Sequence, residues 1–114
     1  MEALEMTLLF DYYGDLLTAR QRACLDMRYN QDLSLGEIAQ ELGVSRQGVF
    51  DNLSRGEALL RNMEEKTGCV RRDREVRRAV SKILSCAAIL KSNPDETVSS
   101  LAAQIIEAIQ SVEE

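Results

Sequence analysis

The residues that could carry out chemistry in this chain of 114 residues are few and scattered. There is no histidine, which excludes Ser-His triads, histidine acid–base catalysis and His-ligated zinc. The cysteines Cys24, Cys69 and Cys86 form no C-x-x-C pair, so thiolate metal sites and thioredoxin-type chemistry have no support. No paired nucleophile and base or phosphate-cradling glycine loop is found. We therefore expect a protein that is not an enzyme and that uses no metal and no cofactor.

Basic side chains are the other residues that could act chemically, by binding phosphate groups, and they are unevenly distributed along the chain. The net charge of −5, from 14 basic and 19 acidic residues, argues against a non-specific nucleic-acid binder, because such proteins neutralise phosphates with Lys and Arg. The acidic excess lies in residues 1–70, whereas residues 71–114 are balanced. The balanced part contains a run that forms either a solvated helix face or an RNA- or phosphate-binding patch: Arg71, Arg72, Arg74, Arg77 and Arg78.

The most informative local pattern lies in residues 34–55 and has the spacing of a helix-turn-helix. Ala39 is small where the two helices must cross, and Gly43 suits the left-handed backbone of a tight turn. Val44 fills that turn, and Ser45 caps the second helix with its first amide groups pointing outward. In this register the second helix presents its N-terminal and outer residues to a nucleic-acid groove.

Helices must hold this motif in place, and apolar residues at helical spacing predict an all-α fold. The first four are expected over about residues 2–13, 18–30, 34–42 and 46–66. Capping boxes open two of them, Thr18 with Gln21 and Ser34 with Glu37, and Gly68 closes the fourth helix. In the second helix Ala23, Cys24 and Met27 are expected to face inward. The buried stripe of the fourth is expected to be Val49, Leu53, Gly56, Leu60 and Met63.

The last third of the chain predicts a helical hairpin. Its fifth helix has the inner face Val76, Ala79, Val80, Ile83, Ala87 and Leu90. The sixth begins at residues 93–96, with Asn93 as its cap, and has the stripe Val98, Leu101, Ala102, Ile105, Ile109 and Val112. Two isolated helices would leave much of this apolar surface wet. We expect residues 1–70 to form a helix-turn-helix domain and residues 71–114 to pack on it or to form a homodimer.

Two segments bring a family resemblance. Residues 26–29, followed by residues 33–47, resemble region 4 of bacterial sigma factors. More closely, residues 8–13, 16–21 and 44–53 are similar to the YlxM-like family of small bacterial helix-turn-helix proteins, over the first two thirds of the chain. This resemblance implies a sigma region 4-like helix-turn-helix bundle, which the C-terminal helical hairpin expected from the residues then follows. It also implies DNA binding and a link to the signal recognition particle pathway.

The candidate nucleic-acid contacts lie at the start and on the outer face of the fourth helix. Arg46 and Gln47 can reach bases or phosphates, and the helix start capped by Ser45 can hold one phosphate. Asn52 either bonds a neighbouring carbonyl group or reads a base. The full predicted binding set is Ser45, Arg46, Gln47, Asn52, Arg55, Arg71, Arg72, Arg74, Arg77 and Arg78.

Two functions follow from these features. The first is a regulatory protein that binds DNA or structured RNA. The second is a protein-interaction module that keeps a sigma-like fold without reading DNA, with the signal recognition particle GTPase as its partner. Phe50 and Asp51 motivate the second, because sigma-type readers place Lys or Arg near Phe50. Asp51 is either a solvated surface charge or an acceptor for a base amino group such as that of cytosine.

The remaining expectations concern location and packing. No apolar run approaches the ~18 residues that span a bilayer, so no membrane association is expected. An odd cysteine count without a signal peptide indicates a cytoplasmic protein with reduced thiols, and these thiols are expected to be buried in the core. Tyr12 and Tyr13 are expected to be packing residues, the alternative being stacking platforms for bases.

Overall fold

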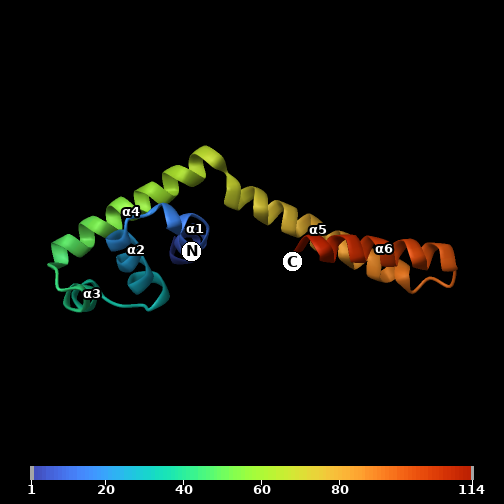
Figure 1. Ribbon diagram of the computed structural model, residues 1–114, viewed down its shortest axis with the longest axis horizontal. Helices are drawn as coiled ribbons and strands as arrows, with labels where there is room; N and C mark the ends of the chain where they lie inside the picture. Colours follow the sequence, from blue (N-terminus) through green and yellow to red (C-terminus); the bar gives the residue numbers. More distant parts are fainter. Residues whose placement is uncertain (1, 114) are drawn as a thin grey trace. The chain divides into compact units, whose positions relative to one another are not determined.

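The computed structural model describes residues 2–113, and these residues form helices and no strand. The all-α prediction is confirmed. The chain divides into two compact units, Met1–Val70 and Arg71–Glu114. The elements are α1 (Glu2–Tyr13), η1 (Gly14–Leu16), α2 (Ala19–Leu25), η2 (Asp26–Asn30), α3 (Leu35–Leu42), α4 (Arg46–Thr67), α5 (Cys69–Lys91) and α6 (Glu96–Glu113) (Figure 1).

Helix α4 is the element on which the first unit assembles. Figure 1 shows α1, α2 and α3 on one side of it, and all three contact it. Its buried residues are Val49, Leu53, Gly56 and Leu60, as the predicted stripe required, while Met63 is half-buried. The other core residues are Met6, Leu9, Tyr13, Leu17, Cys24, Leu25, Ile38 and Ala39.

The predicted caps and glycine turns are confirmed. In both capping boxes the hydroxyl oxygen accepts the N3 amide at 3.1 Å, in Thr18 from Gln21 and in Ser34 from Glu37. Each N3 side chain accepts the amide of the cap residue in return, at 3.1 Å and 3.0 Å. Gly43 and Gly68 have φ of +67° and +62°, the left-handed conformation in which glycine carries no Cβ penalty.

Three sequence-based expectations are corrected. The N-cap of α6 is Asp95, not Asn93: its carboxylate accepts the amide of Thr97 at 2.8 Å, while the Asn93 side chain accepts the Asp95 amide at 2.9 Å. The chain therefore turns once more before the helix begins. Cys24 is buried as expected, but Cys69 is half-buried and Cys86 is exposed. In the second predicted helix, Ala23 is only half-buried, whereas Leu25, which was not expected to face inward, is fully buried; the half-buried Met27 of η2 packs against the core as expected.

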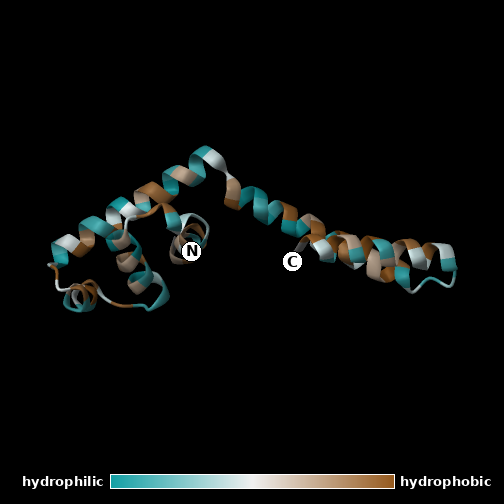
Figure 2. Cartoon of the chain, viewed as in Figure 1, coloured by the Kyte–Doolittle hydropathy of each residue, from teal (hydrophilic) through white to brown (hydrophobic). Residues whose placement is uncertain are grey.

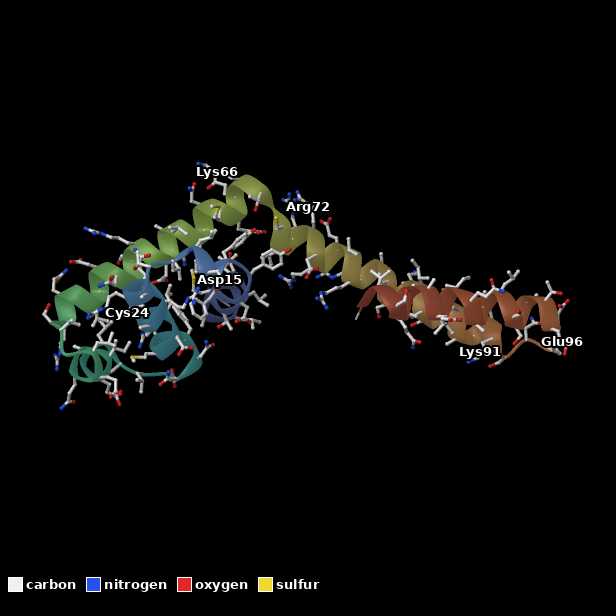
Figure 3. All side chains as sticks on the ribbon, in the orientation of Figure 1. Asp15, Cys24, Lys66, Arg72, Lys91 and Glu96 are labelled. Carbon is white, nitrogen blue, oxygen red and sulfur yellow. The ribbon has the colours of Figure 1, made fainter. Side chains whose placement is uncertain are left out.

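The second unit is a hairpin of α5 and α6. Lys91 and Glu96 lie on either side of its turn (Figure 3), and the Ser99 hydroxyl donates to the Lys91 carbonyl at 2.8 Å. Among residues 71–112, Ala87 and Ala102 are the two that are buried, at 2% and 1% exposure. Most of the predicted inner face of α5 is exposed, and Figure 2 shows apolar residues recurring along both helices. No helix among residues 2–113 has the length and apolar composition to cross a membrane.

Gly56 lies where α2 crosses closest to α4. A Cβ at Gly56 would stand 2.8 Å from Cδ1 of Leu25, a side chain with 0% exposure that has no room to move. We predict that Gly56→Ala lowers the free energy of unfolding by about 1–2 kcal/mol, because overpacking outweighs the gain of about 1 kcal/mol in helix propensity. Urea denaturation followed by circular dichroism measures the change.

Gly36→Ala is the matched control. The nearest neighbour of a Cβ at Gly36 is the guanidinium of Arg46, at 3.1 Å, and this exposed, flexible tip can move aside. Its stability should stay equal or rise by up to about 1 kcal/mol. Equal effects of the two substitutions would contradict the tight crossing at Gly56.

Candidate nucleic-acid interface

The turn between α3 and α4 has the geometry of a helix-turn-helix. The amide groups of Gly43 and Val44 both donate to the carbonyl oxygen of Ala39, the latter at 3.0 Å. Ala39 is only 7% exposed, and Ile38 and Val49 are fully buried in the same core. The left-handed turn at Gly43 thus ends α3 while the small side chain of Ala39 lets it pack closely on α4.

The leading end of α4 is at the surface of its unit. The Ser45 hydroxyl oxygen accepts the Gly48 amide at 3.0 Å, and Ser45, Arg46 and Gln47 are all exposed. The amide groups in the first turn of a helix lack intrahelical partners and give that end a partial positive charge. The predicted presentation of this helix start is therefore present in the structure.

Arg46 is positioned by a residue that the sequence pattern did not single out. Its guanidinium lies over Gly36 in the first turn of α3, so close that a Cβ there would stand 3.1 Å from Nη2. Arg46 has no ion-pair partner among the described residues. The missing side chain at Gly36 therefore leaves room for this cation at the junction of the two helices.

The outer face of α4 is a mixed polar surface. The Nε2 atom of Gln47 donates to Oδ1 of Asp51 at 3.0 Å, and both side chains are exposed. Arg55, one turn further on, is exposed and has no partner among residues 2–113. Ser54 and Ala58 are also exposed, so the predicted outward orientation of this face is confirmed.

Asn52 stands apart from the other α4 candidates. It is half-buried, and its Nδ2 donates to the carbonyl oxygen of Gly48 at 2.8 Å. Of the two alternatives for this residue, the bond to a neighbouring carbonyl is the one that the structure contains. Asn52 thus braces the first turn of α4 from the edge of the core.

The five arginines of the second unit are all exposed on α5. The Nε of Arg77 donates to the carboxylate of Asp73, four residues earlier on the same helix, at 2.8 Å. Arg71, Arg74 and Arg78 recur at intervals of three and four residues and so share one face of the helix. The run thus contains both an internal ion pair and a row of cations on one face.

Two tyrosine hydroxyls, one at the end of α1 and one in η2, form part-buried hydrogen bonds to α4. The Tyr13 hydroxyl donates to Glu64 and lies 2.7 Å from the Thr67 hydroxyl, so its packing role is confirmed. Tyr12 is 51% exposed and makes an edge contact with the Tyr13 ring. The Tyr29 hydroxyl donates to Glu57 at 2.7 Å. Burial, reinforced by this bond and the Glu57 charge, raises the pKa of Tyr29 to about 12.

Among residues 2–113, no group of His, Cys, Asp and Glu side chains is arranged as a metal site. Cys24 is buried, and this burial raises the pKa of its thiol, which disfavours the reactive thiolate.

The candidate site is therefore the exposed, capped start of α4, with Arg46 beside it and Arg55 on the outer face of the helix.

Comparisons with known proteins agree with this geometry. The UPF0122 family model, described as "Putative helix-turn-helix protein, YlxM / p13 like", matches residues 1–99. A UPF0122 protein of Bacillus cereus (strain AH187) is 41% identical over 108 residues, covering 95% of this chain and 94% of the relative. One of Thermoanaerobacter sp. (strain X514) is 51% identical, over 70% and 68%. One of Acetivibrio thermocellus is 59% identical over 66 residues, which span 58% of this chain and 56% of that relative.

The capping box at the start of α3 gives this unit a pH dependence. The Ser34 amide and hydroxyl hold the pKa of Glu37 below its usual value. A carboxylate with a lowered folded pKa stabilises the fold fully above its unfolded pKa of about 4.3 and loses this effect as the pH falls through the folded value. We predict that the free energy of unfolding of the wild type falls relative to that of Glu37→Gln as the pH drops below about 4.3. Urea denaturation of both proteins at several acidic pH values measures this difference. Parallel stability profiles at acidic pH would contradict this.

Proposed function

The chain belongs to the UPF0122 family of YlxM/p13-like helix-turn-helix proteins, and from this premise we propose that it binds nucleic acid through the leading end of α4. Its role is that of a cytoplasmic regulatory protein with no catalytic step. The single observation that carries the proposal is the exposure of Ser45, Arg46 and Gln47 at the capped start of that helix.

The first turn of α4 supports contact with the phosphate backbone. Backbone amide groups at a helix start bind phosphate because they are donors without intrahelical partners. Arg46 adds a full positive charge at the same place, and its guanidinium lies beside Gly36 in the first turn of α3. Such contacts fix the position of a protein on a duplex without reading its sequence.

The outer face of α4 supports base recognition of a particular kind. Asp51 offers only acceptor oxygens, and one of them already receives the Gln47 amide. This face can therefore accept from base amino groups, those of cytosine or adenine in the major groove, and Asp51 would repel the acceptors O6 and N7 of guanine. Arg55 supplies the attraction to phosphate that Asp51 lacks.

The arginines of α5 supply a second, separate source of attraction. Arg71, Arg74 and Arg78 share a face of α5, and Arg72 and Arg77 are exposed beside it. Arginine contacts with phosphate release counterions and bind DNA and structured RNA alike. In this proposal the α4 surface selects the site, and the α5 surface adds affinity that depends on salt.

Replacing Arg55 tests the α4 surface. We predict that Arg55→Gln weakens binding to a duplex DNA by roughly 3–10-fold and flattens the salt dependence by about one phosphate contact, because it removes a single phosphate-facing charge. Fluorescence polarisation with a labelled duplex over a salt series measures both quantities.

Lys66→Gln is the matched control, since Lys66 is an exposed cation on the same helix about 16 Å further along its axis. It should bind like wild type. Asp51→Asn should bind mixed-sequence duplex more tightly, while Asp11→Asn, the same charge change on α1, should not. The proposal fails if wild type binds both DNA and a structured RNA no better than a variant with all five α5 arginines reversed to glutamate.

One observation favours a second candidate function. Phe50 is 52% exposed next to Asp51, and an exposed aromatic side chain is typical of a protein-interface anchor. The family resemblance implies a link to the signal recognition particle pathway, and its GTPase is the partner that this candidate names. In this reading α4 docks on a protein and does not enter a groove.

Phe50→Ala discriminates this candidate. If the GTPase binds at Phe50, the substitution should weaken the complex at least tenfold in a titration with the purified GTPase, as expected for a buried aromatic anchor. Tyr12→Ala is the control, because Tyr12 is an aromatic residue with 51% exposure on α1. An unchanged complex, or an equal loss with Tyr12→Ala, would count against Phe50 as the anchor.

A further inference from the structure

Helix α5 carries a row of exposed apolar residues that the hairpin itself does not use. Val76, Ile83 and Leu90 are 59%, 47% and 45% exposed, although such side chains are usually buried. Ala79 and Cys86 lie between them and are also exposed. The positions recur at alternating intervals of three and four residues, which is the spacing of a coiled-coil seam.

Helix α6 carries a second seam of the same kind. Leu101, Ile105 and Val112 are 54%, 41% and 84% exposed, and the exposed Ala108 completes the intervals of four, three and four. Ile89, an apolar residue with 75% exposure, lies on α5 outside the seam.

Both seams lie on the same side of the hairpin. The buried Ala87 and Ala102 mark the direction in which each helix faces the other. Viewed down each helix axis in the direction of the chain, the centre of the seam is rotated from the buried alanine of that helix by roughly 60–90°. The direction of this rotation is the same in both helices. Because the two helices run antiparallel, equal senses of rotation place the two seams on one face. An open apolar hollow of about 340 Å³, lined by Val80, Ala108, Ile109 and Val112, lies beside them.

We infer that this apolar hairpin face, made of Val76, Ala79, Ile83, Cys86 and Leu90 of α5 with Leu101, Ile105, Ala108 and Val112 of α6, binds the same face of a second copy. The two hairpins run antiparallel and form a four-helix bundle. The exposed side chains of the face offer roughly 700 Å² per copy, close to the approximately 800 Å² per partner of a standard stable interface.

The symmetry of the seams identifies the second copy as the occupant. Ile83 lies midway between Val76 and Leu90. A two-fold axis level with Ile83 therefore places Val76 opposite Leu90 and Ile83 opposite itself, and brings Ala79 to within one residue of the level of Cys86. Val80 of α5 and Ile109 of α6 line the same hollow and therefore lie at about the same level along the hairpin. Because the helices run antiparallel, Ile83, three residues after Val80, lies level with the residue three positions before Ile109. This level falls between Ile105 and Ala108, at the centre of the α6 seam. One axis thus centres both seams.

The charges at the two ends of the hairpin fit this antiparallel arrangement. Arg71 and Arg72 stand at the start of α5, and Asp95 and Glu96 stand at the turn, all four exposed. The two-fold axis level with Ile83 brings the arginines of one copy to the acidic turn of the other. Opposite charges at both ends would favour this direction of pairing over the reverse.

The oligomeric state of the full chain tests the inference. Light scattering after gel filtration should give twice the 12.8 kDa mass of one chain, and Ile83→Lys should halve the measured mass because the charge falls on the axis. Ile89→Lys is the matched control and should leave the dimer intact. Circular dichroism shows whether both variants keep their helices. A wild-type mass of 12.8 kDa would overturn the inference. The face would then be covered by another part of the chain or by a different protein. A dimer that survives Ile83→Lys would also overturn the inference.

A disulfide tests the direction of pairing. Ala79→Cys should form an interchain bond with Cys86 on mild oxidation, and the same variant with Cys86→Ser should not. A dimer in which this bond fails to form would overturn the antiparallel arrangement, because the two cysteines would then not lie near each other across the axis. Neither experiment measures nucleic-acid binding, so the inference and the proposed function can fail separately.

Discussion

The left-handed turn at Gly43 is the constraint on which the rest of the first unit depends. With φ of +67°, a residue with a side chain would be strained there, and nothing else in the turn could stop α3 so abruptly. The turn allows Ala39 to pack in the core, while Ser45 caps the start of α4 at the surface. If the backbone continued in the right-handed conformation, residues 44–47 would extend α3, and no new helix would start at Ser45.

Much of this unit could be predicted from the sequence because its signals are local. Thr18 with Gln21 and Ser34 with Glu37 form hydrogen bonds over three residues, so sequence spacing alone specifies them. The buried stripe of α4 follows from helical periodicity, and the same periodicity places Asp51 and Arg55 on the outward face of the helix. The candidate site is visible in the sequence to the extent that it consists of one helix start and one helix face.

The parts that the sequence did not reveal depend on contacts between elements. Gly36 beneath Arg46 is a packing relation between α3 and α4 that no spacing rule contains. Leu25 of α2 is fully buried beside Gly56 of α4, and this contact too joins two elements that are far apart in the sequence. In the second unit, periodicity located the apolar positions but could not say which of them the hairpin itself would bury.

The central claim of this account is that the exposed start of α4 contacts nucleic acid. Amide NMR spectra of the full chain, recorded during titration with a DNA duplex and with a structured RNA, test it most directly. The account predicts that the largest shifts occur at Ser45, Arg46 and Gln47, with smaller shifts around Arg55. Shifts that leave residues 45–47 unmoved, or spectra that do not change with either nucleic acid, would contradict it.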